Sequence, residues 1–115
     1  MPDIADFNAR WLAAWTKKDV ERLVGFYTED TVYKDPQTPA GLDGRAALRA
    51  YLQGLFAATP AMTYTPDEVW PIPGGFCGRW YCDIAGGARL RGFDLVIFEG
   101  DLIALNEVYV HQLPA

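Results

Sequence analysis

The residue pattern of this chain changes once, near residue 61, and that change limits the possible folds more than any other feature. Before it, apolar residues recur at helical spacing; after it, stretches rich in β-branched and aromatic residues predict strands over 61–70, 76–84, 88–98 and 102–113. The stretches between them, "PIPGG", "AGG" and "EGD", are typical of turns. Helices first and an antiparallel meander second indicate an α+β domain with helices on one face of a curved sheet.

Three helices are predicted in the first half of the chain. Residues 3–17 carry apolar side chains at helical spacing, and the resulting face is strongly aromatic. Asp19 is a favourable N-cap for a second, shorter helix whose apolar residues extend to Tyr27. A third helix is expected to begin at Asp43 or Gly44, because apolar residues after this point lie on one side.

Proline and glycine shape the remaining segments. The stretch "TVYKDP" (31–36) predicts a short strand, and "PQTPAGLDG" (36–44) predicts a loop. Pro66 places the first of the four later strands at an edge or gives it a bulge, because proline donates no hydrogen bond to a ladder.

Length and charge narrow the class of protein. A chain of 115 residues is expected to form one domain over 1–115, and 50% hydrophobic against 22% charged residues can support a core. The net charge of -5 disfavours a nucleic-acid partner. No apolar run of about 18 residues is present, so no membrane span is expected. The first residues lack the basic and apolar regions of a signal peptide, so a cytoplasmic protein is expected.

The cysteines and short motifs offer no cofactor site. Cys77 and Cys82 would point to opposite faces of one strand, so both are predicted to be free and buried rather than paired or metal-binding. No nucleotide, zinc-protease or serine-hydrolase motif occurs. We therefore expect neither a cofactor nor a metal.

The end of the predicted strand 31–36 carries the first candidate for chemistry. Asp35 lies two residues after Tyr33, so both side chains point the same way from a strand, and Pro36 restricts the backbone beside the carboxylate. A general base benefits from such rigidity. An aspartate that begins an Asp-Pro turn explains the same residues.

Three longer stretches carry a family resemblance: "WLAAWTKKDVERLVGFYTEDTVYKDP", "GLDGRAALRAYLQGLF" and "GFDLVIFEGDLIALNEVY". In their order, they resemble the nuclear-transport-factor-2-like superfamily, which includes ketosteroid isomerases, SnoaL-like polyketide cyclases, scytalone dehydratase and limonene epoxide hydrolase. The resemblance implies a cone-shaped, cystatin-like α+β fold with three N-terminal helices on a curved, mostly antiparallel sheet. It covers most of the chain.

The first and last stretches look most like ketosteroid isomerase. By that resemblance, Asp35 matches the general base that takes a proton beside a ketone, and Asp94 matches a protonated aspartate that donates a hydrogen bond to the oxyanion. The isomerase's oxyanion tyrosine falls at Trp11, whose indole can donate a hydrogen bond but has no hydroxyl group.

Strand pairing gives Asp94 a second interpretation. With a two-residue loop at 86–87, Arg79 would lie opposite Asp94; with Gly100 and Asp101 as the next loop, Glu107 would lie opposite it on the other side. Arg79 would then lower the pKa of Asp94 and Glu107 would raise it. A buried ion pair and a catalytic acid both stay open, and a one-residue bulge would change these pairs.

Aromatic and polar residues on the predicted inner faces are candidates for substrate binding. A cone-shaped sheet over helices leaves an opening in which rings contact flat hydrophobic ligands, although the same rings also suit a plain core. His111 shares a strand face with Glu107 and Tyr109; a place at the rim and an acid-base pair with Asp35 are both open. The candidate substrate-binding residues are Trp11, Trp15, Tyr33, Tyr51, Glu107, Tyr109 and His111.

The predicted partners follow from the outer face and the opening. Trp70, Phe76 and Trp80 are placed on the outer face of the sheet, where exposed rings would form a homodimer contact, as is usual in this superfamily. A small hydrophobic molecule is the predicted ligand.

The expected function is a cofactor-free enzyme, of isomerase or cyclase type, that moves a proton on a small hydrophobic carbonyl compound. Epoxide hydrolysis, dehydration and a non-catalytic binding or dimerisation module are the alternatives. The enzyme requires an open apolar pocket with Asp35 at its base. The module predicts an Asp35 that is closed off by hydrogen bonds or faces solvent, and a cavity filled by Trp11, Trp15 and Tyr51.

Overall fold

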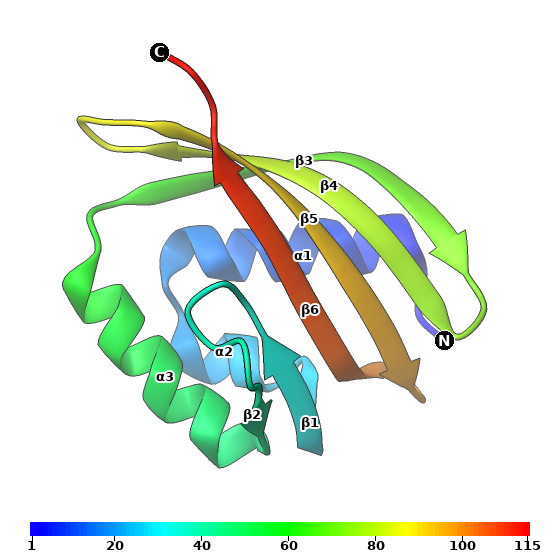
Figure 1. The fold of residues 1–115 in the computed structure, drawn as a ribbon. Coiled ribbons are helices and arrows are strands. Elements are labelled where there is room, and N and C mark those ends of the chain that lie inside the picture. Colours follow the sequence, from blue (N-terminus) through cyan, green and yellow to red (C-terminus); the bar gives the residue numbers. More distant parts are fainter.

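A computed structural model describes residues 1–115 as three helices on one side of a six-stranded, mostly antiparallel sheet (Figure 1). The helices are α1 (Ile4–Lys17), α2 (Val20–Val24) and α3 (Arg45–Ala58). The strands are β1 (Tyr27–Lys34), β2 (Leu42–Asp43), β3 (Met62–Ile72), β4 (Gly75–Ile84), β5 (Arg89–Glu99) and β6 (Leu102–Gln112). This is the α+β, cone-like architecture that the sequence predicts.

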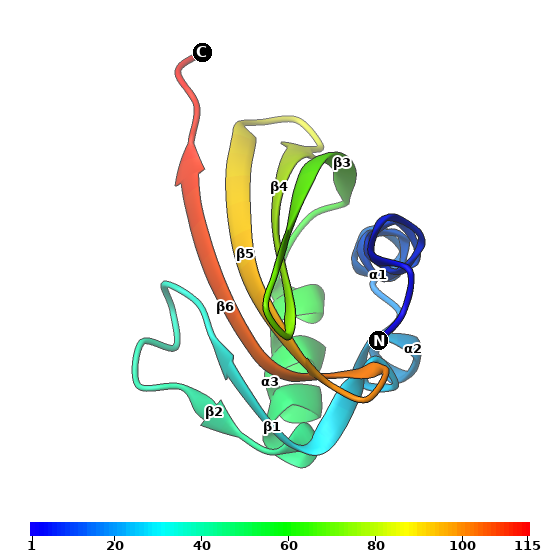
Figure 2. The same cartoon turned by 90° about the vertical axis from the view of Figure 1, so that its right-hand side faces the viewer.

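The strand order β2-β1-β6-β5-β4-β3 places the meander β3 to β6 together, and only β1 and β6 run parallel. Figure 2 shows the sheet bent along its length, with the helices inside the curve. β3 is an edge strand, and its register with β4 shifts between Pro66 and Val69. The prediction from Pro66 is therefore confirmed in both respects.

Capping residues set the helix boundaries. Asp3 and Asp19 accept hydrogen bonds from the backbone N–H groups of Asp6 and Arg22, as N-caps of α1 and α2. α2 ends at Val24, so the prediction that it extends to Tyr27 is wrong, because Tyr27 begins β1 instead. α3 follows Gly44, whose φ of 94° lies in the region that favours glycine.

The β4–β5 hairpin differs from its prediction by one residue. Ile84 donates its N–H to the carbonyl of Ala88, so residues 85–87 form the connection rather than 86–87 alone. Asp94 therefore lies opposite Gly78, and Arg79 lies opposite Phe93 on the other face of the sheet. The predicted pairing of Arg79 with Asp94 is wrong, because a shift of one residue moves a side chain to the opposite face.

The β5–β6 hairpin has the predicted turn and then a bulge. Glu99 pairs with Leu102, as a loop at 100–101 requires, but the register shifts between Ile97 and Phe98. Beyond this bulge Asp94 lies opposite Val108, so the predicted pairing with Glu107 is wrong. A one-residue bulge, the alternative that the sequence left open, is present between β5 and β6.

The core fills the space between the helices and the concave face of the sheet, and it contains Phe76 and Trp80. Their predicted position on the outer face is wrong; of the three rings placed there, only Trp70 is exposed. Both cysteines are free, as predicted, with Cys82 buried and Cys77 only half-buried. None of the helices is long and apolar enough to span a membrane.

Candidate functional site

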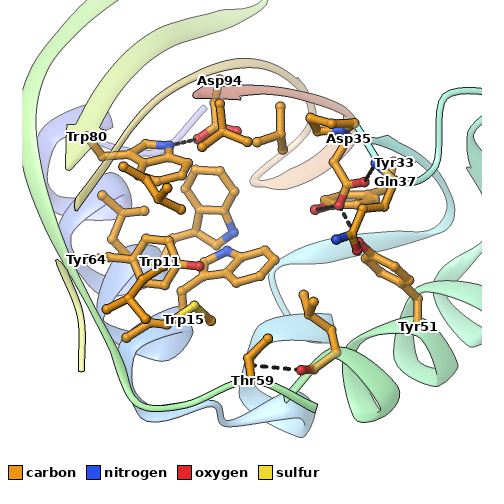
Figure 3. Close-up of a pocket in the computed structure, with 18 residues that line it drawn as sticks. Trp11, Trp15, Tyr33, Asp35, Gln37, Tyr51, Thr59, Tyr64, Trp80 and Asp94 are labelled. Atoms are coloured by element: carbon orange, nitrogen blue, oxygen red, sulfur yellow. Dashed lines mark hydrogen bonds between the residues drawn. The ribbon is translucent and has the colours of Figure 1, made fainter. Parts of the chain in front are cut away.

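A largely apolar pocket of about 250 Å³ lies between α1, α3 and the concave face of the sheet (Figure 3). Thirteen of its 18 lining residues are hydrophobic. Two carboxyl groups, those of Asp35 and Asp94, belong to the lining. An open pocket with both predicted aspartates is a setting in which acid-base chemistry on a small ligand can occur.

Asp94 lies on β5 and is only 3% exposed. Trp80 donates its indole N–H to Oδ2 at 2.6 Å, and the Asn106 amide donates to Oδ1 at 3.2 Å. Burial raises the pKa of Asp94 to about 7, and these two hydrogen bonds lower it by less. At neutral pH the carboxyl group of Asp94 is therefore protonated in part of the molecules, and in these it can donate a hydrogen bond.

Arg79 does not pair with this carboxyl group. Its Nε donates to Oδ2 of Asp67 at 2.6 Å, on the outer face of the sheet. Asp94 forms no salt bridge at all, so no positive charge on the chain offsets the cost of ionising it in an apolar pocket, and only its two hydrogen bonds reduce that cost.

A buried chain of hydrogen bonds links Asp94 to the first helix. Trp11 donates its indole N–H to the Tyr27 hydroxyl at 3.2 Å, and Tyr27 donates to Oδ1 of Asn106 at 2.9 Å. Asn106 then donates to Asp94. The indole N–H of Trp11 is thus used inside the protein, while its ring lines the pocket.

Asp35 lies at the other side of the pocket, at the end of β1, and it accepts hydrogen bonds with both oxygens. Tyr33 and Tyr51 donate their hydroxyl groups to Oδ2 at 2.9 and 2.6 Å. Oδ1 accepts from the N–H groups of Gln37 and Thr38 at 2.8 and 3.0 Å and from the Thr38 hydroxyl at 3.2 Å. Asp35 is therefore both a turn residue and a pocket carboxylate.

A carboxylate offers about four lone-pair sites. Asp35 accepts five hydrogen bonds, so none of these sites is left for a further donor. One of them has another acceptor within reach, because the Tyr51 hydroxyl also lies 3.2 Å from Oε1 of Gln37. Rotation of that hydroxyl toward Gln37 would free one site on Oδ2 of Asp35. Burial, together with Asp35, raises the pKa of both Tyr33 and Tyr51, so both phenols stay protonated donors at neutral pH.

Four predicted binding residues line the pocket and three do not. Trp11, Trp15, Tyr33 and Tyr51 contribute to its wall, as predicted. Glu107, Tyr109 and His111 are not on the wall, so the predicted inward position is wrong for Glu107 and Tyr109, while His111 has the exposed position that was one of its two alternatives. The bulge in β5–β6 explains the error, because it turns Val108 and Val110 toward the pocket in their place.

The three outer residues have contacts of their own. Glu107 lies 3.7 Å from the Lys34 ammonium, and Tyr109 is 60% exposed. His111 accepts a hydrogen bond from Nε of Arg91 at 3.0 Å. None of them contacts Asp35 or Asp94, so an acid-base pair of His111 with Asp35 is not formed.

Several residues of the site are not among those predicted from the sequence. Asn106 carried a signal, since it is a polar residue in an apolar strand, two positions before Val108. Tyr27 was assigned to a helix, and Trp80 to the wrong face of the sheet. Tyr64 and Gln37 also line the pocket, but their spacing alone does not set them apart from other strand and loop residues.

The residues give no metal centre: no group of three or more His, Cys, Asp or Glu side chains is placed so that it could hold a metal ion.

Comparison with known proteins gives the family. The family model described as the SnoaL-like domain matches residues 8–106. No curated protein matches the chain.

Solved structures give the fold. A protein of ketosteroid-isomerase-like fold from Catenulispora acidiphila, in complex with trimethylamine, is 18% identical with a TM-score of 0.78, over 93% of this chain and 86% of that one. A cystatin-fold protein from Novosphingobium aromaticivorans is also 18% identical, with a TM-score of 0.74, over 90% and 95% of the two chains. A SnoaL-like protein of unknown function from Burkholderia thailandensis is 16% identical, with a TM-score of 0.77, over 93% of each chain.

Proposed function

The chain belongs to the SnoaL-like domain family, and from that premise we propose that it is a cofactor-free enzyme that moves a proton on a small, largely apolar carbonyl compound. One observation supports the proposal most directly. Two carboxyl groups share one apolar pocket: burial raises the pKa of Asp94, whereas Asp35 accepts hydrogen bonds with both of its oxygens.

Asp94 is assigned the role of acid. In its protonated form it donates a hydrogen bond to the carbonyl oxygen of the substrate, while Trp80 and Asn106 hold the carboxyl group in place. As a proton leaves the neighbouring carbon, negative charge develops on that oxygen, and a donor in an apolar pocket stabilises this charge strongly.

Asp35 is assigned the role of base. Its five donors suit an ionised carboxylate, and the proton can reach Oδ2 once the Tyr51 hydroxyl turns toward Gln37. Return of the proton to another carbon completes an isomerisation. Attack of the enolate on a second carbonyl within the same molecule, followed by return of the proton to the alkoxide that forms there, completes a cyclisation. The pocket supports both outcomes equally.

Proton exchange tests this assignment. Small ketones are incubated with the protein in D₂O, and deuterium at the carbons beside the carbonyl is followed by NMR. Exchange is expected in the wild type, with a loss of roughly 10²-fold or more in Asp35→Asn and in Asp94→Asn. Glu107→Gln is the matched control, because this carboxylate lies outside the pocket; a loss there, or no exchange in the wild type, would contradict the proposal.

Two alternatives lose the residues that suggested them. An arginine beside Asp94 would support epoxide hydrolysis, and a histidine beside Asp35 would support dehydration. Arg79 bonds to Asp67 and His111 to Arg91 instead, and neither residue lines the pocket. A non-catalytic binding module keeps one supporting observation, the full hydrogen bonding of Asp35. Ligand binding with no proton exchange would favour that module.

The predicted homodimer belongs to the same proposal. Three rings are exposed on the outer face of the sheet, those of Trp70, Phe93 and Tyr109. Phe93 and Tyr109 lie opposite each other on β5 and β6, and the ring centroids of Trp70 and Phe93 are 5.9 Å apart. An exposed aromatic group of this kind supports contact with a second copy of the chain.

A further inference from the structure

The pocket contains two carboxyl groups and no basic side chain. Lysine, arginine and histidine are absent from its 18 lining residues. Neither Asp35 nor Asp94 takes part in a salt bridge. The Asp35 carboxyl group accepts hydrogen bonds from neutral donors alone, so no cation of the chain is paired with it.

The wall of the pocket is aromatic on several sides. Its rings are Trp11, Trp15, Tyr33, Tyr51, Tyr64 and Trp80. The face of an aromatic ring attracts a cation, and Trp does so most strongly. The chain's own cation–π contacts involve other rings, those of Phe7, Phe26, Phe56, Trp70 and Tyr81. No cation of the chain therefore lies over a ring of the pocket.

The arrangement in Figure 3 places these two features around the same space. Asp35 and Tyr51 lie on one side of the pocket, and Trp11 and Trp15 lie across from them. A positive group between the two sides would contact a carboxylate and indole rings together. An anion in the same place would lie beside a carboxyl group that no cation of the chain balances, and a neutral ligand would bring no positive charge to it.

The size of the pocket limits the ligand. A cavity of about 150 Å³ holds benzene, so about 250 Å³ corresponds to roughly ten non-hydrogen atoms. A four-ring molecule of steroid size is too large to be enclosed.

We propose that this pocket selects small organic cations, namely a protonated amine or a quaternary ammonium group on a compact apolar body, with the charge between Asp35 and the indole rings of Trp11 and Trp15. That the cation is a substrate rests on the proposed proton transfer. In that case, its positive charge also stabilises the enolate formed beside it.

A set of three ligands of nearly equal shape tests the proposal on the wild-type protein. Choline carries a positive charge, 3,3-dimethylbutan-1-ol is its neutral counterpart, and 3,3-dimethylbutanoate is an anion of similar size. Binding is measured by calorimetry and by the fluorescence of the tryptophans in the pocket. Choline is expected to bind roughly tenfold more tightly than the alcohol, or better, with no binding of the anion. Equal affinity for choline and the alcohol, or tighter binding of the anion, would overturn the proposal.

Variants assign the preference to its carboxylate. Asp35→Asn is expected to reduce the ratio of the choline and alcohol affinities to about one. Glu107→Gln, which changes an outer-face carboxylate, is expected to keep the ratio, and a loss there would point to long-range charge instead. If Asp35→Asn does not fold, the wild-type comparison still decides, because it requires no variant.

The two proposals fail separately. Proton exchange on neutral ketones without any preference for choline would remove the cation site and leave the proton transfer in place. A clear preference for choline without proton exchange on any ketone, neutral or cationic, would remove the proton transfer and leave the cation site in place.

Discussion

Asp94 ties the stability of the fold to pH. Burial raises its pKa from 3.8 to about 7, so the folded protein keeps a proton that the unfolded chain releases near pH 4. Between these two values the folded state binds more protons. The free energy of unfolding should therefore fall as the pH rises from about 4 to about 7, by up to about 4 kcal/mol, and Asp94 should add no further change above that range.

Asp94→Asn isolates this contribution, because its side chain stays neutral at every pH. Urea unfolding of both proteins at several pH values gives the difference between the two curves. We expect that difference to grow in favour of the variant from pH 4 to pH 7. A difference that stays constant with pH would mean that Asp94 is not held protonated by the fold.

Tyr27 holds together the hydrogen bonds behind the pocket. Tyr27→Phe removes one hydroxyl group, which leaves the N–H of Trp11 and Oδ1 of Asn106 buried without partners. We expect a loss of about 2–4 kcal/mol in the free energy of unfolding, measured in urea. Tyr109→Phe removes an exposed hydroxyl group and should leave the unfolding midpoint unchanged; an equal effect of both variants would contradict the buried network.

At the scale of the elements, Gly92 on β5 lies opposite Trp80 and leaves room for the indole ring that donates a hydrogen bond to Asp94. A Cβ at Gly92 would lie 2.0 Å from the Trp80 ring, so only glycine lets the indole lie where its N–H reaches Asp94. Gly92→Ala should displace the ring, cost about 1–3 kcal/mol and change the near-UV circular dichroism. Gly54→Ala, in α3 with open space around it, should instead stabilise by about 0.5–1 kcal/mol. The same sign for both variants would refute this account of Gly92.

The elements were predictable where one local signal decides them. Helical spacing predicted α1, the N-cap Asp19 predicted the start of α2, and turn compositions separated the strands of the meander. Tyr33 and Asp35 were placed together because two residues apart in a strand share a face, and their hydrogen bond confirms it.

Spacing in the sequence did not predict which residues of β4, β5 and β6 face the pocket and which face outward. One extra residue in the β4–β5 connection and one bulge in β5–β6 decide which residues face Asp94. These features moved Arg79, Glu107 and His111 out of the expected site and brought in Val108. Their causes are local backbone geometry and packing against the helices, and neither leaves a period in the sequence.

At the scale of the whole molecule, the bend of the sheet around α1 and α3 creates the pocket (Figures 1 and 2). The inner face of the sheet thereby contributes Trp80, Asp94 and Val108, while Asp35 comes from the residue that follows β1. The architecture thus brings the two carboxyl groups into one space although they lie far apart in the sequence. The family model and the solved structures support this fold, and the chemistry depends on the residues placed within it.

The outer face gives the prediction for assembly. If the exposed rings of Trp70, Phe93 and Tyr109 contact a second copy, light scattering should give twice the mass of one chain. Phe93→Lys should then shift the protein to the monomer, because it places a charge in the contact. Asp83→Lys, a change of charge on an exposed residue away from these rings, is the control. A monomeric wild type, or an unaffected dimer in Phe93→Lys, would contradict the predicted interface.

The account depends above all on a carboxylic acid that keeps its proton near neutral pH inside an aromatic pocket. Carbon-13 NMR of labelled aspartate side chains measures this directly, with Asp94→Asn to assign the signal. We predict a midpoint of about 7 for Asp94 in the folded protein. A midpoint near 4, the ordinary range of an aspartate in water, would contradict the role of Asp94 as proton donor and with it the proposed proton transfer.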